Sequence, residues 1–272
     1  MVSEDKVREI KEKTIRLCIN AGIGHVTSAF SIAEVVCILY YEIMKINPGN
    51  PCWSDRDRFV LSKNHASVIT FPILEELGFL RIQNDFLKNG SSLGIHTKLG
   101  VKGIDFCGGS LGIGLGVACG MAYGAKLDDK NYMVFTVIGD GECYEGSIWE
   151  AVLFAAANKL DNLVVFIDRN RMCITDFTEN MLPIDSLNEK FKAFNWDVKE
   201  INGHDLDEIR RSLTDVRAKR GKPLCIILNT VKGKGVSFLE NALFWHGKAP
   251  KGELAEQALV ELEEVRYDGK SN

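Results

Sequence analysis

The stretch Met133–Gly146, "MVFTVIGDGECYEG", ends an apolar run with an aspartate held between two glycines. Asp-Gly is a familiar hairpin signal, so a simple turn is one interpretation. A hairpin needs a second strand directly afterwards, but Ser147–Asn158 is alanine-rich and has apolar residues at helical spacing. A strand, a glycine-flanked loop and a helix together present backbone N–H groups to phosphate. The carboxylate of Asp140 in such a loop indicates a metal ion shared with that phosphate.

A second polar side chain follows the next apolar run, "NLVVFIDRNRM", which places Asn170 one strand–helix–strand unit after Asp140. If the two strands are neighbours in a parallel sheet, they lie about 4.8 Å apart and both residues emerge at the same edge. Asp140, the amide oxygen of Asn170 and the carbonyl of Met172 would then offer three hard ligands to Mg²⁺. The alternative is that Asn170 only turns the chain after its strand.

The glycine-rich segment "CGGSLGIGLGVACGMAYG" is a second candidate for phosphate contact, through Gly108, Gly109 and Ser110 at a helix entry. It has the look of a dinucleotide fingerprint, but no strong strand precedes it and no suitably placed acidic residue follows, so nicotinamide binding is disfavoured. Glycines recur every four residues on one face of the predicted helix, which favours close approach of another helix, from this chain or from another one: 112, 116, 120 and 124.

The chain has five histidines, and a lone histidine is usually a packing or surface residue. His204 precedes Asp205, a predicted helix N-cap, and is interpreted as structural. No two histidines have the short spacing of a zinc-binding pair. Concentration in junction loops favours histidines that polarise oxygens or move protons, and four histidines fit this description: His25, His65, His96 and His246.

Periodicity predicts the elements that position these residues. Alternating strands and helices in the C-terminal half predict right-handed crossovers and a parallel sheet, with ligands at the carboxyl ends of its strands. We therefore expect one α/β domain over residues 1–272. The expected strands are 59–62, 132–138, 163–168, 195–201 and 223–230. The expected helices are 7–21, 31–45 (opened by a capping box at Ser31 and Glu34), 65–78, 110–127, 146–159, 186–193 and 205–219.

Composition narrows the class of protein. The chain has 272 residues, 46% hydrophobic and 26% charged, which is ordinary for a globular protein. The net charge of −4 disfavours nucleic-acid and membrane-surface partners. No apolar run approaches the roughly 18 residues of a membrane span. The charged N-terminus has no apolar signal core, and the eight cysteines form no C-x-x-C pair, so a reducing cytoplasm is expected.

The motifs together resemble one family. GDG, followed thirty residues later by asparagine, resembles the thiamine-diphosphate-binding motif. The histidine-containing segments narrow the resemblance to the N-terminal, diphosphate-binding half of transketolases. It covers roughly residues 10 to 250 and rests on "GHVTSAFSIAEV", "NPGNPCWSDRDRFVLSKNHAS", "GSLGIGLGVACGMA" and "TVKGKGVSFLEN…WHGKAP".

The resemblance implies a role for each matching residue. Asp140, Asn170 and the carbonyl of Met172 would hold Mg²⁺, with Ca²⁺ or Mn²⁺ as substitutes. Thiamine diphosphate would be held by His65, Gly109, Ser110, Leu111, Gly141, Asn170 and His246. The catalytic group would be His25, His96 and His246, which face the substrate, together with Glu145 and Glu150 near the contact between cofactor-binding halves.

The implied activity is transfer of a two-carbon ketol unit from a ketose phosphate to an aldose phosphate. No second α/β domain is seen to supply the glutamate that activates the pyrimidine ring, so a C-terminal partner chain and an α2β2 assembly are expected. Substrate preference stays open, because Thr27, Ile113, Arg171 and Thr175-Asp176 depart from the family pattern. Alternatives are a 2-oxo-acid dehydrogenase alpha chain, 1-deoxyxylulose-5-phosphate synthase or a non-catalytic scaffold subunit.

Overall fold

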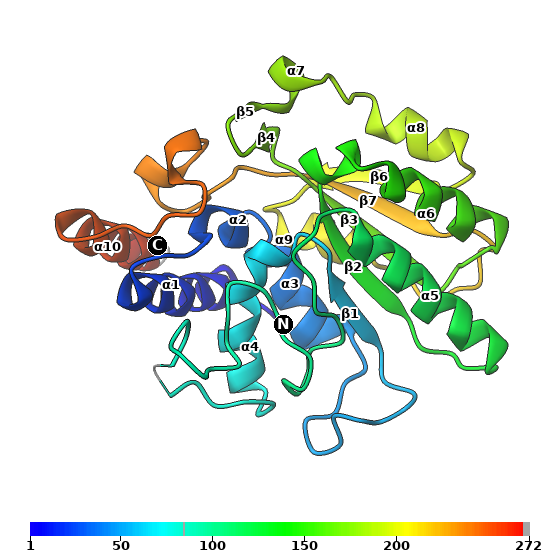
Figure 1. The fold of residues 1–272 in the computed structure, drawn as a ribbon, viewed down its shortest axis with the longest axis horizontal. Helices are drawn as coiled ribbons and strands as arrows, with labels where there is room; N and C mark the ends of the chain where they lie inside the picture. Colours follow the sequence, from blue (N-terminus) through cyan, green and yellow to red (C-terminus); the bar gives the residue numbers. More distant parts are fainter. Residues whose placement is uncertain (84, 269–272) are drawn as a thin grey trace.

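The computed structural model describes residues 1–83 and 85–268 and has a five-stranded sheet at its centre (Figure 1). The strand order is β1-β2-β3-β7-β6, and every neighbouring pair is parallel. This confirms the expected α/β fold with a mostly parallel sheet. The five strands are β1 (Arg58–Leu61), β2 (Val134–Gly139), β3 (Leu163–Arg169), β6 (Asp197–Asn202) and β7 (Leu224–Asn229); a small antiparallel hairpin pairs β4 (Met172–Cys173) with β5 (Asp176–Phe177).

Helices cover both faces of the sheet (Figure 1). They are α1 (Glu4–Ala21), α2 (Val26–Phe30), α3 (Ala33–Ile38), α4 (Thr70–Glu76), α5 (Ile113–Leu127), α6 (Gly146–Ala157), α7 (Thr178–Met181), α8 (Leu187–Ala193), α9 (Leu206–Ser212) and α10 (Glu253–Asp268). Shorter helical turns lie at Leu39–Ile43, Asn64–Ile69, Gly141–Tyr144, Ser237–Leu239 and Leu243–Trp245. Within residues 1–83 and 85–268, no helix has the length and apolarity that crossing a bilayer would require.

Side chains of the central strands alternate between two hydrophobic clusters. Phe135 and Val137 of β2 join the cluster beneath α1 and α3, whereas Val134 and Ile138 join the one beneath α5 and α6. This is the two-residue period of a strand whose two faces are both buried. It explains why β2 and β3 are continuous apolar runs in the sequence, and it leaves the strand ends as the place where polar side chains emerge.

The predicted helix 31–45 is shorter than expected. It begins at Ala33 as α3 and ends at Ile43 in a π-helical turn, and Ser31-Ile32 separates it from the short helix α2. The predicted capping box is wrong, because Ser31 Oγ donates to a carboxylate oxygen of Asp168 at 2.7 Å and Glu34 pairs with Lys11. Long-range polar partners have therefore replaced the local cap.

Other boundaries also shift. The predicted helix 110–127 begins only at Ile113, because Gly112 has a φ of 85°, in the left-handed region. The predicted helix 65–78 starts as a 3₁₀ turn before α4, although Gly78 ends it as expected with a φ of 83°. The predicted helix 205–219 ends at Ser212 and continues as turns. Helix α10 is an addition to the elements that the sequence predicts.

Candidate cofactor site

Asp140 and Asn170 emerge at the same edge of the sheet, as the sequence predicts. Strands β2 and β3 are parallel neighbours, with Gly139 in register with Asp168. Asp140 is 1% exposed, and its carboxylate accepts N–H bonds from Gly141 at 2.8 Å and from Arg171 at 2.6 Å. Burial raises the pKa of Asp140, and the neighbouring Asp168 raises it further. A cation beside Asp140 would offset both effects.

Asn170 is held in one orientation by its own loop. Its Oδ1 accepts the N–H of Met172 at 3.0 Å, and its Nδ2 donates to Asp168 at 2.7 Å. Between Asn170 and Met172, Arg171 has a φ of 64°, which is uncommon for a residue other than glycine. Arg171 stands where the family pattern has glycine, and the left-handed turn is what that position requires. The turn brings Asn170 and Met172 to one cavity.

The donors at this edge fit a hard divalent cation. A carboxylate, an amide oxygen and a backbone carbonyl are the ligand types of Mg²⁺ and Ca²⁺. Among residues 1–83 and 85–268, no group of three His, Cys, Asp or Glu side chains is arranged to hold a metal, so a zinc-type cluster is absent there. Arg169 Nη1 also donates to Asp140, at 3.1 Å. This fixed positive charge keeps the carboxylate in place without filling all its lone pairs.

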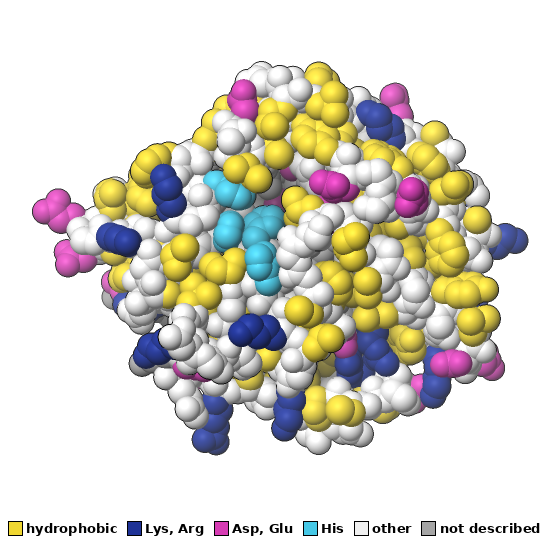
Figure 2. Space-filling model, viewed as in Figure 1, with side chains coloured by type: hydrophobic (Ala, Val, Ile, Leu, Met, Phe, Trp, Pro, Cys, Tyr) yellow, Lys and Arg dark blue, Asp and Glu magenta, His cyan; other side chains and the backbone are white. Residues whose placement is uncertain are grey.

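Three histidines from distant parts of the chain lie together beside these donors. Ring centroids of His25 and His65 are 5.1 Å apart, those of His25 and His246 are 5.2 Å apart, and those of His65 and His246 are 5.8 Å apart. Figure 2 shows histidine side chains gathered in a hollow on one face of the molecule. His96 lies against Gly109, since a Cβ atom there would be 3.5 Å from its Cε1, and it is near enough to His25 to contribute, after burial, to the lowered pKa of that imidazole.

Burial makes these histidines neutral at pH 7. It lowers the pKa of His25 to about 4 and of His246 to about 3, and it lowers the pKa of His65 and of His96 as well. Nδ1 of His25 and Nδ1 of His246 are buried and have no hydrogen-bond partner among the described residues. Neutral imidazoles with an unpaired nitrogen can donate to or accept from a ligand in the cavity.

Two buried lysines also line the cavity, and the sequence motifs single out neither of them. Lys63 forms an ion pair with Asp168 and donates to the carbonyl of Ser28 at 3.1 Å. Lys232 is 5% exposed, and burial, followed by repulsion from Lys63, lowers its pKa to about 8. The sequence does hold a signal for Lys232, since it follows β7 by three residues and β7 ends at the same edge as β3.

Glu142, within the GDGECYEG stretch, is a further residue of the site that the motifs do not single out. It is 2% exposed, and its carboxylate accepts N–H bonds from Gly112 at 2.9 Å and from Gly139 at 3.0 Å. Glu142 therefore ties the loop before α5 to the end of β2. Of the residues predicted to contact phosphate before α5, only Leu111 lines the cavity. Gly109 and Ser110 lie next to it and are exposed.

Glu145 and Glu150 are not brought together with the histidines. Both are exposed, Glu145 just before α6 and Glu150 on it, and neither lines the cavity. The cavity itself is lined by Ser28, Lys63, His65, Leu111, Asp140, Gly141, Asn170, Met172, Lys232 and His246, among others.

Residues 3–262 match the family model described as transketolase, thiamine diphosphate binding domain. The chain belongs to the transketolase N-terminal family. It is 40% identical over 257 residues to a 6-deoxy-6-sulfo-D-fructose transketolase subunit from Clostridium sp. (strain MSTE9), covering 93% of this chain and 94% of that one. It is 38% identical over 256 residues to an apulose-4-phosphate transketolase subunit from Phocaeicola vulgatus, covering 93% of this chain and 91% of that one.

Longer members of the family match over only part of their length. Human transketolase is 37% identical over 262 residues, which cover 95% of this chain and 42% of the human protein. The structure of transketolase from Campylobacter jejuni superposes with a TM-score of 0.90 at 28% identity, covering 97% of this chain and 43% of that one. The family member described here thus corresponds to the diphosphate-binding part of these longer enzymes.

Proposed function

We propose that this transketolase-family chain is the N-terminal subunit of a thiamine-diphosphate- and Mg²⁺-dependent transketolase that moves a two-carbon ketol unit from a ketose to an aldose. One observation carries the proposal: Asp140 and Asn170 end neighbouring strands at a cavity that also holds His65 and His246. The bound cofactor supplies the nucleophilic carbon and the electron sink for cleavage of a carbon–carbon bond. The protein supplies binding, orientation and proton transfer.

The metal and diphosphate would be held at the sheet edge. Asp140, the amide oxygen of Asn170 and the carbonyl of Met172 are the proposed Mg²⁺ ligands, with Ca²⁺ or Mn²⁺ as substitutes. Lys63 and Lys232 place positive charge in the same cavity, which favours a diphosphate. The remaining proposed contacts are His65, Gly141, His246 and the backbone of Gly109, Ser110 and Leu111.

The substrate would face the histidines. His25, His96 and His246 are neutral at pH 7, so they can donate hydrogen bonds to hydroxyl and carbonyl oxygens and transfer protons. The two relatives that match over nearly their whole length are named for 6-deoxy-6-sulfo-D-fructose and apulose 4-phosphate. Together with the departures at Thr27 and Ile113, these names favour a specialised sugar over a standard pentose phosphate.

A partner chain would complete the enzyme. The same two relatives are named as subunits, which supports a C-terminal partner that brings the pyrimidine-binding domain, in an α2β2 assembly. Glu145 and Glu150 are exposed beside α6 and are proposed to lie near that contact. All eight cysteines are free, which suits a reducing cytoplasm.

The experiment that tests the proposal is a calorimetric titration of thiamine diphosphate with Mg²⁺ into the enzyme assembled with the partner subunit, carrying either the wild-type chain or its Asp140→Ala variant. Loss of a charged metal ligand should weaken binding at least about 10-fold. Asp128→Ala removes an exposed carboxylate at the end of α5 and should leave the affinity unchanged. Equal affinity of wild type and Asp140→Ala would contradict the proposed site.

A further inference from the structure

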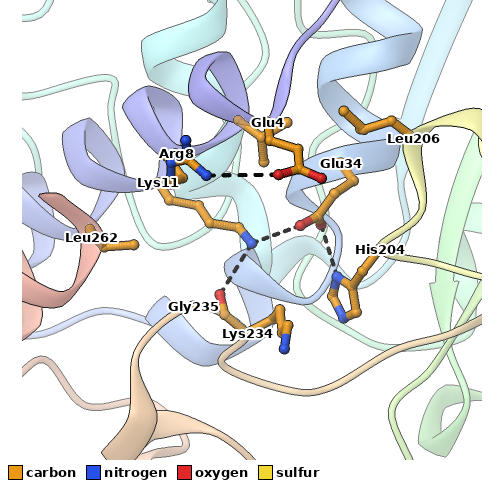
Figure 3. A pocket seen from close by; sticks show the side chains of 10 residues that line it. Glu4, Arg8, Lys11, Glu34, His204, Leu206, Lys234, Gly235 and Leu262 are labelled. Carbon is orange, nitrogen blue, oxygen red and sulfur yellow. Dashed lines mark hydrogen bonds and ion pairs between the residues drawn. The ribbon is translucent and has the colours of Figure 1, made fainter. Parts of the chain in front are cut away.

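A second cavity, of about 200 Å³, lies beside Lys234 and Gly235 in the loop after β7 (Figure 3). Its other walls come from α1, α3, the turn before α9, the start of α9 and α10. Three side chains at its floor form a chain of polar contacts: Lys11, Glu34 and His204. None of the three belongs to the cofactor cavity, and the proposed function gives them no role.

These contacts reach the backbone of the loop after β7 at two points. Lys11 Nζ donates to Glu34 Oε1 at 2.8 Å and to the carbonyl of Lys234 at 3.1 Å. At the other end, His204 Nε2 accepts the N–H of Val231 at 2.8 Å. Because Nε2 accepts, the neutral imidazole carries its proton on Nδ1, which lies 3.2 Å from Glu34 Oε2. One carboxylate therefore contacts both groups that hold the loop: it accepts a hydrogen bond from Lys11 and lies within ion-pair distance of His204, without hydrogen-bond geometry to it.

The loop between these two points has little freedom. Gly233 donates its N–H to the carbonyl of Thr27 at 3.0 Å, and the carbonyl of Lys232 accepts the N–H of Asn241 at 2.8 Å. Gly233 has a φ of 85°, and a Cβ atom there would lie 2.3 Å from the carbonyl oxygen of Leu239. In this tight path Lys232 lines the cofactor cavity, while Lys234 and Gly235 line the second cavity.

The pair of Lys11 and Glu34 is buried, at 4% and 6% exposure. Burial alone would raise the pKa of Glu34, but Lys11 and His204 lower it more, so the carboxylate is ionised. Buried ion pairs contribute little net stability, since desolvation offsets much of their attraction. Their better-attested use is to select one arrangement of the chain, and here that arrangement includes the loop with Lys232.

From these contacts we propose that Glu34 is a positioning residue for cofactor binding. Through Lys11 and His204 it fixes the backbone from Val231 to Lys234, and so it holds Lys232 in the cofactor cavity, where the positive charge of the ammonium group would favour a diphosphate. The inference rests on the proposed function, because it takes the cavity to be the thiamine-diphosphate site. It assigns no contact between Glu34 and the ligand.

A double-mutant cycle tests this. Thiamine diphosphate with Mg²⁺ is titrated calorimetrically into the enzyme assembled with the partner subunit, which carries the wild-type chain, Glu34→Gln, Lys232→Met or the double variant. Because Glu34 acts through Lys232, Glu34→Gln should weaken binding about 10-fold in the wild-type background and less than about 2-fold when Lys232 is already Met. Glu4→Gln is the matched control, since Glu4 lines the same cavity but pairs with Arg8 there; it should leave the affinity unchanged.

An equal loss in both backgrounds would overturn the inference, as would an unchanged affinity of a folded Glu34→Gln variant. If Glu34→Gln does not fold, His204→Phe serves in its place, because it removes the acceptor for Val231 N–H and the contact of Nδ1 with Glu34 but keeps the pair of Lys11 and Glu34. The double-mutant cycle is then run with His204→Phe and Lys232→Met, and an equal loss of affinity in both backgrounds would again overturn the inference. Failure of the wild-type assembled enzyme to bind thiamine diphosphate at all would contradict the proposed function itself, which is a distinguishable outcome.

Discussion

The cavity at the strand ends differs from the outer face of α5 and α6 in how many contacts its side chains make within this chain. In the cavity, the fully buried carboxylate of Asp168 accepts hydrogen bonds from Ser31, Lys63, Asn170 and Thr230. On the outer face, large apolar side chains stay uncovered, with exposed fractions of 50% at Ile113, 69% at Leu127, 59% at Leu153 and 42% at Phe154. The buried carboxylate of Asp168 is fully partnered in the first region, whereas apolar contacts are incomplete in the second.

The same contrast runs along α5 itself. A Cβ atom on Gly114 would lie 2.7 Å from the Cα of Ser62, so this glycine permits close packing inside the chain. A Cβ atom on Gly116, Gly120 or Gly124 would have no neighbour within 4 Å. An exposed apolar face with small residues at helical spacing is typical of a surface that another chain covers. We therefore expect cavity variants to change binding and chemistry, and outer-face variants to change assembly.

The largest effect is expected in the cavity, for His25→Ala and His246→Ala. A histidine that donates to a developing oxyanion or transfers a proton contributes on the order of 100-fold to turnover. Each variant of the assembled enzyme should therefore lose about that much ketol transfer, measured as turnover with a ketose donor. The assembly and the melting temperature should change little, because neither side chain touches the outer face.

His204→Ala is not a suitable control, since His204 holds the loop with Lys232. Phe244→Ala serves better, because Phe244 is 66% exposed and close to His246 in the sequence. It should keep near-wild-type turnover. If His25→Ala and His246→Ala also keep it, the chemistry belongs to other residues, and the histidine cluster has no catalytic role.

Sequence alone predicts the cavity's strand-end residues but not its histidine cluster. Asp140 and Asn170 follow adjacent strands of one β-α-β unit, so the pleated geometry of a parallel sheet suffices to place them. His25, His65 and His246 come from three junctions spread over the chain, and no local periodicity brings them together. Only the resemblance to transketolases predicts their grouping.

The features that the sequence predicts wrongly or misses also depend on contacts between distant parts of the chain. Ser31 and Glu34 have the spacing of a capping box, yet each finds a long-range partner that is absent from any local window, Asp168 for Ser31 and Lys11 for Glu34. Lys232 escapes motif analysis because a lysine in a glycine-rich segment is usually solvated. The buried charges of Asp168 and Glu34 are stabilised by residues far away in the chain, which local spacing does not reveal.

On the outer face, we expect Gly120→Leu to have a smaller effect. It should stabilise the single chain but weaken assembly. In the single chain the new side chain meets open space and replaces a poor helix former, which should raise the free energy of unfolding by up to about 1 kcal/mol. In the assembly the side chain should clash with the covering subunit. Sedimentation of the chain co-expressed with its companion subunit should therefore show less assembled enzyme, although the single chain melts no lower.

Gly114→Ala is the matched contrast on the same helix, because its Cβ atom would press on Ser62 inside the chain. It should lower the melting temperature of the single chain, whereas Gly120→Leu should not. Full assembly of Gly120→Leu would show that α5 faces solvent in the working enzyme. The outer face would then not be a surface that another chain covers.

A further effect concerns acid stability and separates the two regions without a partner chain. His25 and His246 have folded-state pKa values of about 4 and about 3, below an unfolded value of about 6.5, because burial disfavours their charged forms. Their contribution to stability is thus fully present above about pH 6.5 and is lost as the pH falls toward 4, by at most about 1.4 kcal/mol per pH unit and histidine.

The double variant His25→Asn/His246→Asn should lose fewer degrees of melting temperature between about pH 7 and about pH 5 than the wild type. Gly120→Leu, which leaves the cavity intact, should follow the wild-type pH dependence. If the histidine variant follows it as well, the two imidazoles are solvated in the free chain, and the cavity would be as open to water as the outer face.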